Sequence, residues 1–398
     1  MVFKPLFCEI TSYWDWPILR SQICEHYFCY PIELMIQKGF KTEVLTTLTS
    51  QKDQKQCEEY ENLSIYRFMK VNTPPHILSF GIHVFSHIAE RRYSLIHVHN
   101  INGFADVASW IASRVKNTPM VFTSHNHDAF ERFLASEPSA SPLRQKISQK
   151  WFVKDSPTCV FTAFTKTQAQ IYQRLGINNV EIIPHGIDPK VFEVQLDHTI
   201  VKKHNLDEFN ILCVGVIDPR KGQHFLVSSM PSIIKEYPHT RLILVGRSFQ
   251  QYQREHLHML RNQVRSLDLQ EKVIFIDNIS RDELIQLYLA SSVFALPTRA
   301  EMFGLVFLEA MGAGLPIVST NTPHIKEILG DGKAGILVER ERKSIENAIL
   351  TLLGDEPIRK KMGNNGKKLV HDKYCLDDVI QKYWQLYEKI MAVAQNPG

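Results

Sequence analysis

The chain has 398 residues, of which 44% are hydrophobic, 22% charged and 10% aromatic, and its formal net charge is +4. Because single hydrophobic cores stop growing at about 250 to 300 residues, this length predicts two domains, and the apolar content excludes a disordered chain. The mild charge falls short of the basic surface of a nucleic-acid-binding protein, so nucleic acid is excluded as a partner.

The seven cysteines form neither a Cys-x-x-Cys pair nor a clustered framework, which is typical of a protein in a reducing cytosol. The first residues show no apolar run followed by small residues, and nowhere do about 18 apolar residues follow one another. The sequence therefore predicts a cytoplasmic protein without a signal peptide or a membrane-spanning helix.

Short apolar runs alternate with amphipathic stretches from Phe7 to His185, which is the pattern of a parallel sheet covered by helices on both faces. The stretches 77–91 and 105–115 repeat apolar residues every three or four positions and are expected to be helices. Strands are expected at 41–46, 95–98, 120–123, 158–163 and 180–184.

A polar, irregular stretch at 188–208 interrupts this alternation, and we expect it to be a linker. A second alternation begins at Phe209, with strands expected at 241–245, 273–276, 293–296 and 316–319. The stretch 372–391 then carries large apolar residues at helical spacing. We expect a Rossmann-like domain at 1–190, a second one at 191–370, and a helix at 371–398 that packs back on the first domain.

The stretch 297–316 predicts a strand end, a turn, and a helix that begins near Gly304 and stops at Gly314. The unpaired N–H groups at a helix start and the helix dipole favour phosphate there, and a glycine lets a ligand approach the backbone. Glu301 and Glu309 lie on either side of this start, and each carboxylate can accept hydrogen bonds from hydroxyl groups. A nucleoside diphosphate that carries a sugar suits this arrangement.

The residues around these two glutamates resemble a known signature. Phe-Gly-Leu lies between Glu301 and Glu309, and Ala-Met-Gly-Ala-Gly-Leu-Pro follows, as in the donor site of glycosyltransferase family 4. Segments 182–188, 214–222, 242–246, 331–338 and 355–363 also resemble this family. The resemblance implies the GT-B fold, in which two doubly wound, Rossmann-like domains face each other across a cleft and the C-terminal helix crosses back to the first.

The same resemblance implies a retaining, metal-independent transferase that moves a sugar from a nucleotide-diphosphate donor to an acceptor hydroxyl. It assigns catalysis to His125, Lys221 and Glu301. The donor-binding residues that it implies are Gly215, Arg220, Lys221, Glu301, Phe303, Gly304, Leu305 and Glu309.

The family holds the diphosphate with a lysine and an arginine. Lys221 matches the lysine, whereas the arginine position is Val216, and Arg220 is the candidate that replaces it. The resemblance also places Glu301 on the transferred sugar, Glu309 on the ribose, and His125 opposite the donor sugar. In such a mechanism the departing phosphate oxygen takes the acceptor proton, so that no separate base is required.

No metal or other cofactor is expected. The sequence contains no Asp-x-Asp pair, which other glycosyltransferases use to hold a divalent ion. Several candidate ligands lie close together in the sequence: His97, His99, His125, His127 and Asp128. The first two alternate along one expected strand end, whereas metal ligands must converge from several elements, so we expect no metal site.

The expected partners are a UDP or GDP sugar, whose base would lie near 246–248 and 277–279, and a glycan or lipid-linked acceptor. The segment 141–154 is basic with interleaved apolar residues, which suits either a solvated helix face or a peripheral contact with an anionic membrane. The segment 11–17 replaces the family's Gly-Gly loop on the acceptor side.

Two other functions remain compatible with the sequence. Val216 and the missing Gly-Gly loop fit a donor-binding but catalytically weak partner subunit of a glycosyltransferase complex. Sugar-nucleotide epimerases share the same architecture, although the glutamate signature argues against that activity.

Overall fold

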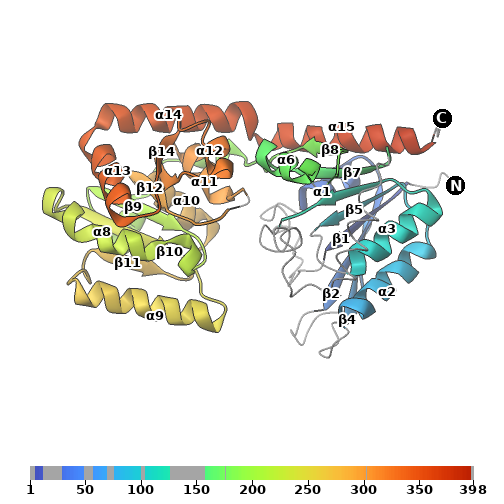
Figure 1. The fold of residues 1–398 in the computed structure, drawn as a ribbon, viewed down its shortest axis with the longest axis horizontal. Coiled ribbons are helices and arrows are strands. Elements are labelled where there is room, and N and C mark those ends of the chain that lie inside the picture. The colour runs from blue at the N-terminus through green and yellow to red at the C-terminus, as the bar shows by residue number, and fades with distance from the viewer. Residues whose placement is uncertain are drawn as a thin grey trace. The chain divides into compact units, whose positions relative to one another are not determined.

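The computed structural model describes residues 5–11, 29–48, 57–69, 76–99, 104–125, 157–174, 176–301 and 303–395 (Figure 1). The loop at 12–17, the basic segment at 141–154, His127 and Asp128 lie outside these ranges. The chain divides into two compact units, unit 1 with Met1–Pro184 and Val379–Gly398, and unit 2 with His185–Asp378. Each unit is an α/β domain built on a largely parallel sheet, as the sequence predicts.

Unit 1 is built on a sheet with strand order β3-β4-β2-β1-β5-β6-β7-β8, in which every pairing except β3 with β4 is parallel. Its strands are β1 (Leu6–Thr11), β2 (Lys41–Leu48), β3 (Cys57–Glu59), β4 (Leu63–Met69), β5 (Leu95–His99), β6 (Met120–Thr123), β7 (Cys159–Ala163) and β8 (Val180–Ile182). Its helices are α1 (Cys29–Gln37), α2 (His76–Ala89), α3 (Phe104–Lys116), α6 (Lys166–Arg174) and α15 (Leu376–Gln395).

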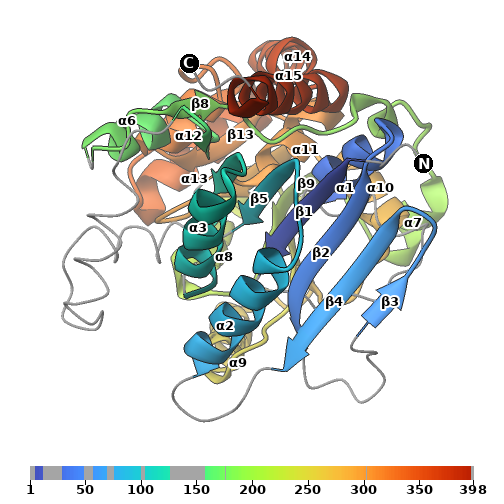
Figure 2. The ribbon, with the colours of Figure 1, turned by 90° about the vertical axis from the view of Figure 1, so that its right-hand side faces the viewer.

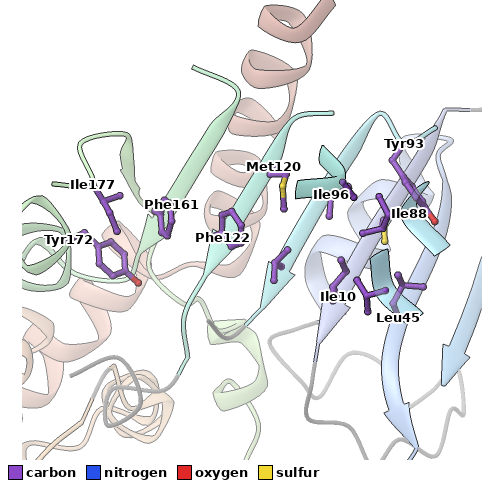
Figure 3. Close-up of a cluster of buried hydrophobic side chains, with 14 of the residues drawn as sticks. Ile10, Leu45, Ile88, Tyr93, Ile96, Met120, Phe122, Phe161, Tyr172 and Ile177 are labelled. Carbon is purple, nitrogen blue, oxygen red and sulfur yellow. The ribbon is translucent and has the colours of Figure 1, made fainter. Parts of the chain in front are cut away.

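Successive side chains of these strands point to opposite faces of the sheet, so each strand contributes to two cores. One core joins residues such as Ile96, Phe122 and Phe161 to helices α2, α3 and α6, and its members run across the sheet in Figure 3. Figure 2 shows α2 and α3 side by side on this face. The short apolar runs predicted from the sequence are therefore buried on both faces of the sheet, as expected for a parallel sheet covered by helices.

The other core joins the opposite side chains of the same strands to α1 and α15. Leu95, Val121 and Val160 pack here with Tyr383 and Tyr387 of the C-terminal helix. This contact confirms the expected return of the C-terminal helix to the first domain, and it explains why α15 is counted with unit 1 although it ends the chain.

Unit 2 is built on a fully parallel sheet with strand order β11-β10-β9-β12-β13-β14. Its strands are β9 (Phe209–Val214), β10 (Thr240–Val245), β11 (Val273–Ile276), β12 (Val293–Leu296), β13 (Ile317–Thr320) and β14 (Gly335–Val338). Its helices are α7 (His198–Lys203), α8 (Gln223–Glu236), α9 (Gln251–Ser266), α10 (Arg281–Leu289), α11 (Leu305–Ala313), α12 (Pro323–Ile328), α13 (Arg342–Gly354) and α14 (Glu356–Lys373), with 3-10 turns η2 (Pro189–Phe192) and η3 (Pro219–Lys221).

The strand order of unit 2 reverses between β9 and β12. The chain runs from β9 outward through β10 to β11, and then returns to place β12 on the other side of β9. In open α/β sheets, ligands bind beside the carboxyl ends of the strands at such a reversal, because the following loops diverge there. The strand order therefore predicts a ligand site at the loops after β9 and β12.

The stretch 188–208, expected to be an irregular linker, has local structure of its own. Asp188 accepts a hydrogen bond from the backbone N–H of Lys190 and begins η2, and Asp197 accepts one from Thr199 and begins α7. The sequence interpretation missed these two caps because both helical segments are very short. The observed boundaries of unit 2, His185 and Asp378, lie outside the expected 191 and 370.

Backbone pairing explains the position of these boundaries. The Ile187 N–H donates to Tyr374 O, and the Leu376 N–H donates to Ile187 O. These bonds join segments near the two ends of unit 2, and no local sequence pattern predicts them. Among the helices that the structure describes, none combines the length and the apolar composition needed to cross a bilayer.

Candidate functional site

The loop after β9 begins at Gly215 and ends at Gly222, where helix α8 starts. Gly222 has φ +77°, and a Cβ atom there would lie 2.4 Å from Pro297 O, at the end of β12. Only a glycine fits this left-handed conformation and this close backbone approach. The loops that follow β9 and β12 are therefore in direct contact at the point where the strand order reverses.

Helix α11 starts beside this contact. Gly304, with φ +74°, is its N-cap and supplies no side-chain acceptor for the first N–H groups. A Cβ atom at this position would lie 2.8 Å from the Phe307 ring, so the turn requires glycine. Phe303 is buried against His185 and Tyr374, which holds the turn in place. The free helix start favours an anion near Leu305.

Lys221 and Glu301 form an ion pair between the two loops, in which the Lys221 ammonium donates to Glu301 Oε1. Both side chains are largely buried, with 17% and 15% of their surface exposed. The structure thus brings together two residues that the sequence assigned separately to the diphosphate and to the sugar. Gly215 lies next to the Lys221 side chain, and a Cβ atom there would be 3.8 Å from Lys221 Cε.

Glu309 lies in the second turn of α11 and is 9% exposed. It accepts hydrogen bonds from Arg281 and from the Tyr288 hydroxyl, which is 2.8 Å away. Burial and the Glu309 charge hold the pKa of Tyr288 well above its ordinary value, so the phenol stays a donor. The sequence interpretation missed both partners, because spacing along α10 does not reveal which face of that helix meets α11.

Arg220 lies next to Lys221 but turns its guanidinium to Asp218, with an Nε to Oδ1 distance of 3.2 Å. Asp218 is 1% exposed and also accepts hydrogen bonds from Tyr252 and Gln253. Burial alone would raise the pKa of Asp218, but the hydrogen bonds from Arg220 and Gln253 outweigh it, so that pKa lies below its ordinary value. Arg220 is still 47% exposed, which leaves part of its guanidinium accessible.

Arg340, just after β14, connects the same loops, and the sequence interpretation missed it. Its Nε donates to Pro297 O at 3.0 Å, and one of its terminal nitrogens donates to Pro219 O at 2.8 Å and to Arg220 O at 3.2 Å. Burial, followed by the positive charge of Arg299, lowers the pKa of Arg340. The guanidinium therefore holds the loops after β9 and β12 together and adds positive charge beside them.

The segments expected to contact the nucleobase lie at the ends of β10 and β11. Arg247 donates from Nε to Asp277 O at 3.0 Å and from a terminal nitrogen to Asn278 Oδ1 at 2.5 Å. Arg247 thus joins the two segments, which follow the paired strands β10 and β11.

His125 follows β6 in unit 1. Its Nε2 lies 2.8 Å from His99 Nδ1, and its ring lies close to those of His99 and Phe164. Within the described ranges, no three histidine, cysteine, aspartate or glutamate side chains are arranged to hold a metal ion. Two of the residues weighed as metal ligands, His127 and Asp128, lie outside those ranges.

The chain matches two family models and several known proteins. The model of Glycosyl transferases group 1 matches residues 197–369, and that of Glycosyltransferase Family 4 matches residues 26–191. An uncharacterized glycosyltransferase of Methanocaldococcus jannaschii is 25% identical over 383 residues, which are 90% of this chain and 92% of that protein.

A second relative is the GDP-mannose-dependent alpha-(1-6)-phosphatidylinositol monomannoside mannosyltransferase of Mycobacterium tuberculosis. It is 28% identical over 215 residues, which are 51% of this chain and 54% of the relative. Among solved structures, HepE of Anabaena in complex with UDP and glucose has a TM-score of 0.74 at 18% identity, covering 96% of this chain and 99% of HepE.

The two family models together account for most of the chain, and the structural match to HepE covers 96% of it. The chain belongs to glycosyltransferase family 4, has the GT-B fold, and is a nucleotide-sugar-dependent glycosyltransferase.

Proposed function

We propose that the enzyme transfers a sugar from a UDP or GDP sugar to an acceptor hydroxyl, with retention of configuration and without a metal ion. One observation carries this proposal. Lys221, Glu301 and the start of α11 lie together where the strand order of unit 2 reverses. They supply a cation, a carboxylate and free backbone donors in one place, which match a phosphate and a sugar hydroxyl.

The diphosphate binds at the start of α11 and at Lys221. An ammonium group has three N–H donors, so Lys221 can keep its bond to Glu301 while it donates to a phosphate oxygen. The helix dipole and the lysine stabilise the charge that grows on the departing diphosphate, which is the task that a divalent ion performs elsewhere. Arg220 supplies the second cation in place of Val216, because it lies next to Lys221 and 47% of its side chain is exposed to solvent.

Glu301 accepts hydroxyl hydrogens of the transferred sugar, and Glu309 accepts those of the ribose. A carboxylate offers about four lone-pair sites, and Arg281 and Tyr288 use two of those on Glu309. The carboxylate is therefore oriented before the ribose arrives, which lowers the entropy lost on binding.

In the transfer step, the bond between the anomeric carbon and the phosphate oxygen breaks while the acceptor oxygen forms a bond to the same face of that carbon. The acceptor proton passes to the departing phosphate oxygen, so the step needs no further base. His125 acts on the donor sugar in this step. The protein contributes mainly positioning and charge stabilisation.

The acceptor is a hydroxyl of a lipid or of a growing glycan, reached at the cytoplasmic face of a membrane. A lipid acceptor is supported by the name of the mycobacterial relative, which includes phosphatidylinositol monomannoside. Flotation of the full-length protein with vesicles of neutral lipid, and with vesicles that contain anionic lipid, tests this. Failure to float with both kinds would remove the membrane from the proposal.

The central test has three parts. A thermal-shift screen against UDP-, GDP-, ADP- and CMP-sugars identifies the donor, because a ligand at 100 times its dissociation constant adds about 2.7 kcal/mol of stability. Donor hydrolysis by the single chain, followed by NMR, then shows whether the released sugar keeps its anomeric configuration, and the assay is repeated with EDTA. Binding without turnover would favour the partner-subunit alternative, and an isomerised donor would favour the epimerase.

A further inference from the structure

A line of buried polar side chains crosses unit 1 from the C-terminal helix to the centre of the sheet. The Tyr387 hydroxyl on α15 lies 2.7 Å from His97 Nδ1, and His97 Nε2 lies 2.8 Å from Thr123 Oγ1 on β6. Thr123 in turn is hydrogen-bonded to Thr162 on β7. All four side chains are buried, and 0% of His97 is exposed.

The direction of these hydrogen bonds follows from the end of the line. Thr162 donates to Phe122 O, and a carbonyl oxygen can only accept. Thr123 must then donate to Thr162, so its oxygen accepts from the N–H at Nε2 of His97. Burial and the charge of His99 hold the pKa of His97 well below its ordinary value, so the ring is neutral and its Nδ1 carries no proton. Nδ1 therefore accepts from the Tyr387 hydroxyl.

The ring of His97 packs against that of His99, its neighbour on the same face of the same strand. The rings of His97 and His99 are 4.0 Å apart between centroids and are inclined by 37°. His99 Nδ1 lies 2.8 Å from His125 Nε2, so these two rings meet edge to edge, with centroids 5.1 Å apart and planes inclined by 24°. The ring of Phe164 also lies next to His125, with centroids 5.2 Å apart.

A hydrogen bond between two imidazole nitrogens needs one N–H and one bare nitrogen. The bond between them therefore constrains the plane of the His125 ring and couples the tautomer of His125 to that of His99. We propose that His99 is a positioning residue that sets the orientation and the tautomer of His125, and that Tyr387 of the C-terminal helix holds His99 in place through His97. This inference rests on the proposed role of His125 at the donor sugar.

Helix α15 would then affect turnover through Tyr387. An imidazole misaligned at the reacting sugar reduces turnover without weakening donor binding to the same degree, because positioning acts in the transition state. Removal of the Tyr387 hydroxyl would therefore change the orientation of His125, although Tyr387 binds neither the donor nor the acceptor.

Substitutions at His99 separate the hydrogen bond from the packing. H99F keeps an aromatic ring but loses Nδ1, whereas H99N loses the ring but places an amide group near the position of Nδ1. We expect H99F to lower kcat for hydrolysis of UDP-glucose or GDP-mannose by about tenfold with little change in KM, and H99N to recover most of that loss. Equal losses in both variants, or none in H99F, would overturn the inference.

Tyr387 has a matched control in the same unit. Tyr93 is also a buried tyrosine, and its hydroxyl donates to Glu43, which lies near the amino end of β2. Y387F and Y93F both remove one buried hydroxyl, so both should lower the melting temperature. Only Y387F should lower kcat, by a few fold, and a kcat loss of the same size in Y93F would contradict the inference.

Two further measurements cover the remaining outcomes. If H99F does not fold, H99Q replaces it: its amide reaches towards the place of Nε2 instead of Nδ1, so only H99N should retain kcat. The ¹⁵N chemical shifts of the His125 ring, assigned with H125A, report the tautomer without any turnover. They should change in H99F and persist in Y93F, and an unchanged tautomer in H99F would refute the proposal.

The same variants separate this inference from the proposed function. If H125A hydrolyses the donor at the wild-type rate, the assigned role of His125 fails and the inference fails with it. If H125A loses activity while H99F keeps it, the role of His125 stands and the inference alone fails.

Discussion

The ammonium group of Lys221 donates to the carboxylate of Glu301, although the two residues lie 80 positions apart in the sequence. Each residue follows the end of a different strand, and the two strands, β9 and β12, are neighbours at the reversal of the sheet. The ion pair therefore joins the side chain proposed to bind the diphosphate directly to the side chain proposed to bind the sugar.

Lys221→Ala should lower kcat/KM for donor hydrolysis by about ten- to a hundredfold. A charge-assisted hydrogen bond to phosphate contributes about 1.5 to 3 kcal/mol, and the substitution also leaves Glu301 without its cation. Steady-state kinetics with the selected donor measure the effect. Lys326→Ala, which removes an exposed lysine of the same unit, is the control. Equal kcat/KM values in the two variants would mean that Lys221 does not bind the donor.

Arg220→Ala and Arg340→Ala should have different consequences. Arg340→Ala removes three hydrogen bonds that connect two loops, so we expect the free energy of unfolding to fall by about 1.5 to 3 kcal/mol. Arg220→Ala should instead raise the donor dissociation constant by about tenfold with a smaller loss of stability. Urea unfolding and donor titration measure the two effects.

Arg342→Ala is the control for Arg340, because Arg342 is 53% exposed, its ion pair with Glu346 is long at 3.6 Å, and Glu346 keeps its shorter pair with Lys343. Such pairs contribute about 0 to 1 kcal/mol. If both arginine variants lose the same stability, the loops do not depend on Arg340. Unchanged donor affinity and turnover in Arg220→Ala would show that Arg220 does not replace the arginine missing at Val216.

Tyr288→Phe should raise the donor KM and lower the free energy of unfolding by about 1 kcal/mol, because Glu309 loses one of the two groups that orient it. Donor titration of the variant measures the first effect and thermal unfolding the second. Tyr374→Phe is the matched control, since its buried hydroxyl donates to Ile328 O instead of Glu309. A larger KM change in the control than in Tyr288→Phe would contradict the role of Glu309 on the ribose.

His224 should make the protein less stable as the pH falls from about 6.5 to about 4. Burial, followed by the charges of His256 and Arg340, lowers the pKa of His224 to about 4. The unfolded chain binds a proton at His224 below about pH 6.5, whereas the folded chain does so only near pH 4, so in this window protonation favours unfolding.

Urea unfolding across this pH range, with His224→Gln beside the wild type, measures the contribution. The variant should show a flatter dependence of the free energy of unfolding on pH. His371→Gln, which removes an imidazole that is 82% exposed, should leave the slope unchanged. A wild-type slope in His224→Gln would show that another group titrates in this window.

The strands that the sequence predicts are confirmed to within two residues at each end, because each is a short apolar run bounded by turn residues. The expected 120–123, 273–276 and 293–296 coincide with β6, β11 and β12. Strands β1, β3, β4 and β14 were not among the expected ones; β3 has only three residues, which is too short for an apolar pattern to be recognised. The two caps at Asp188 and Asp197 were missed for a related reason, because each starts a segment of six residues or fewer.

The amino-acid sequence by itself determined the local features of the enzyme: alternating strands and helices, the helix start at Gly304, and the family signature around Glu301 and Glu309. Only the tertiary structure decided which side chains meet. Lys221 and Glu301 are 80 positions apart, Arg340 and Arg220 are 120 apart, and Tyr387 and His97 are 290 apart. The physical reason is that strand order and helix return bring such residues together, whereas periodicity and turn chemistry act over only a few neighbouring positions.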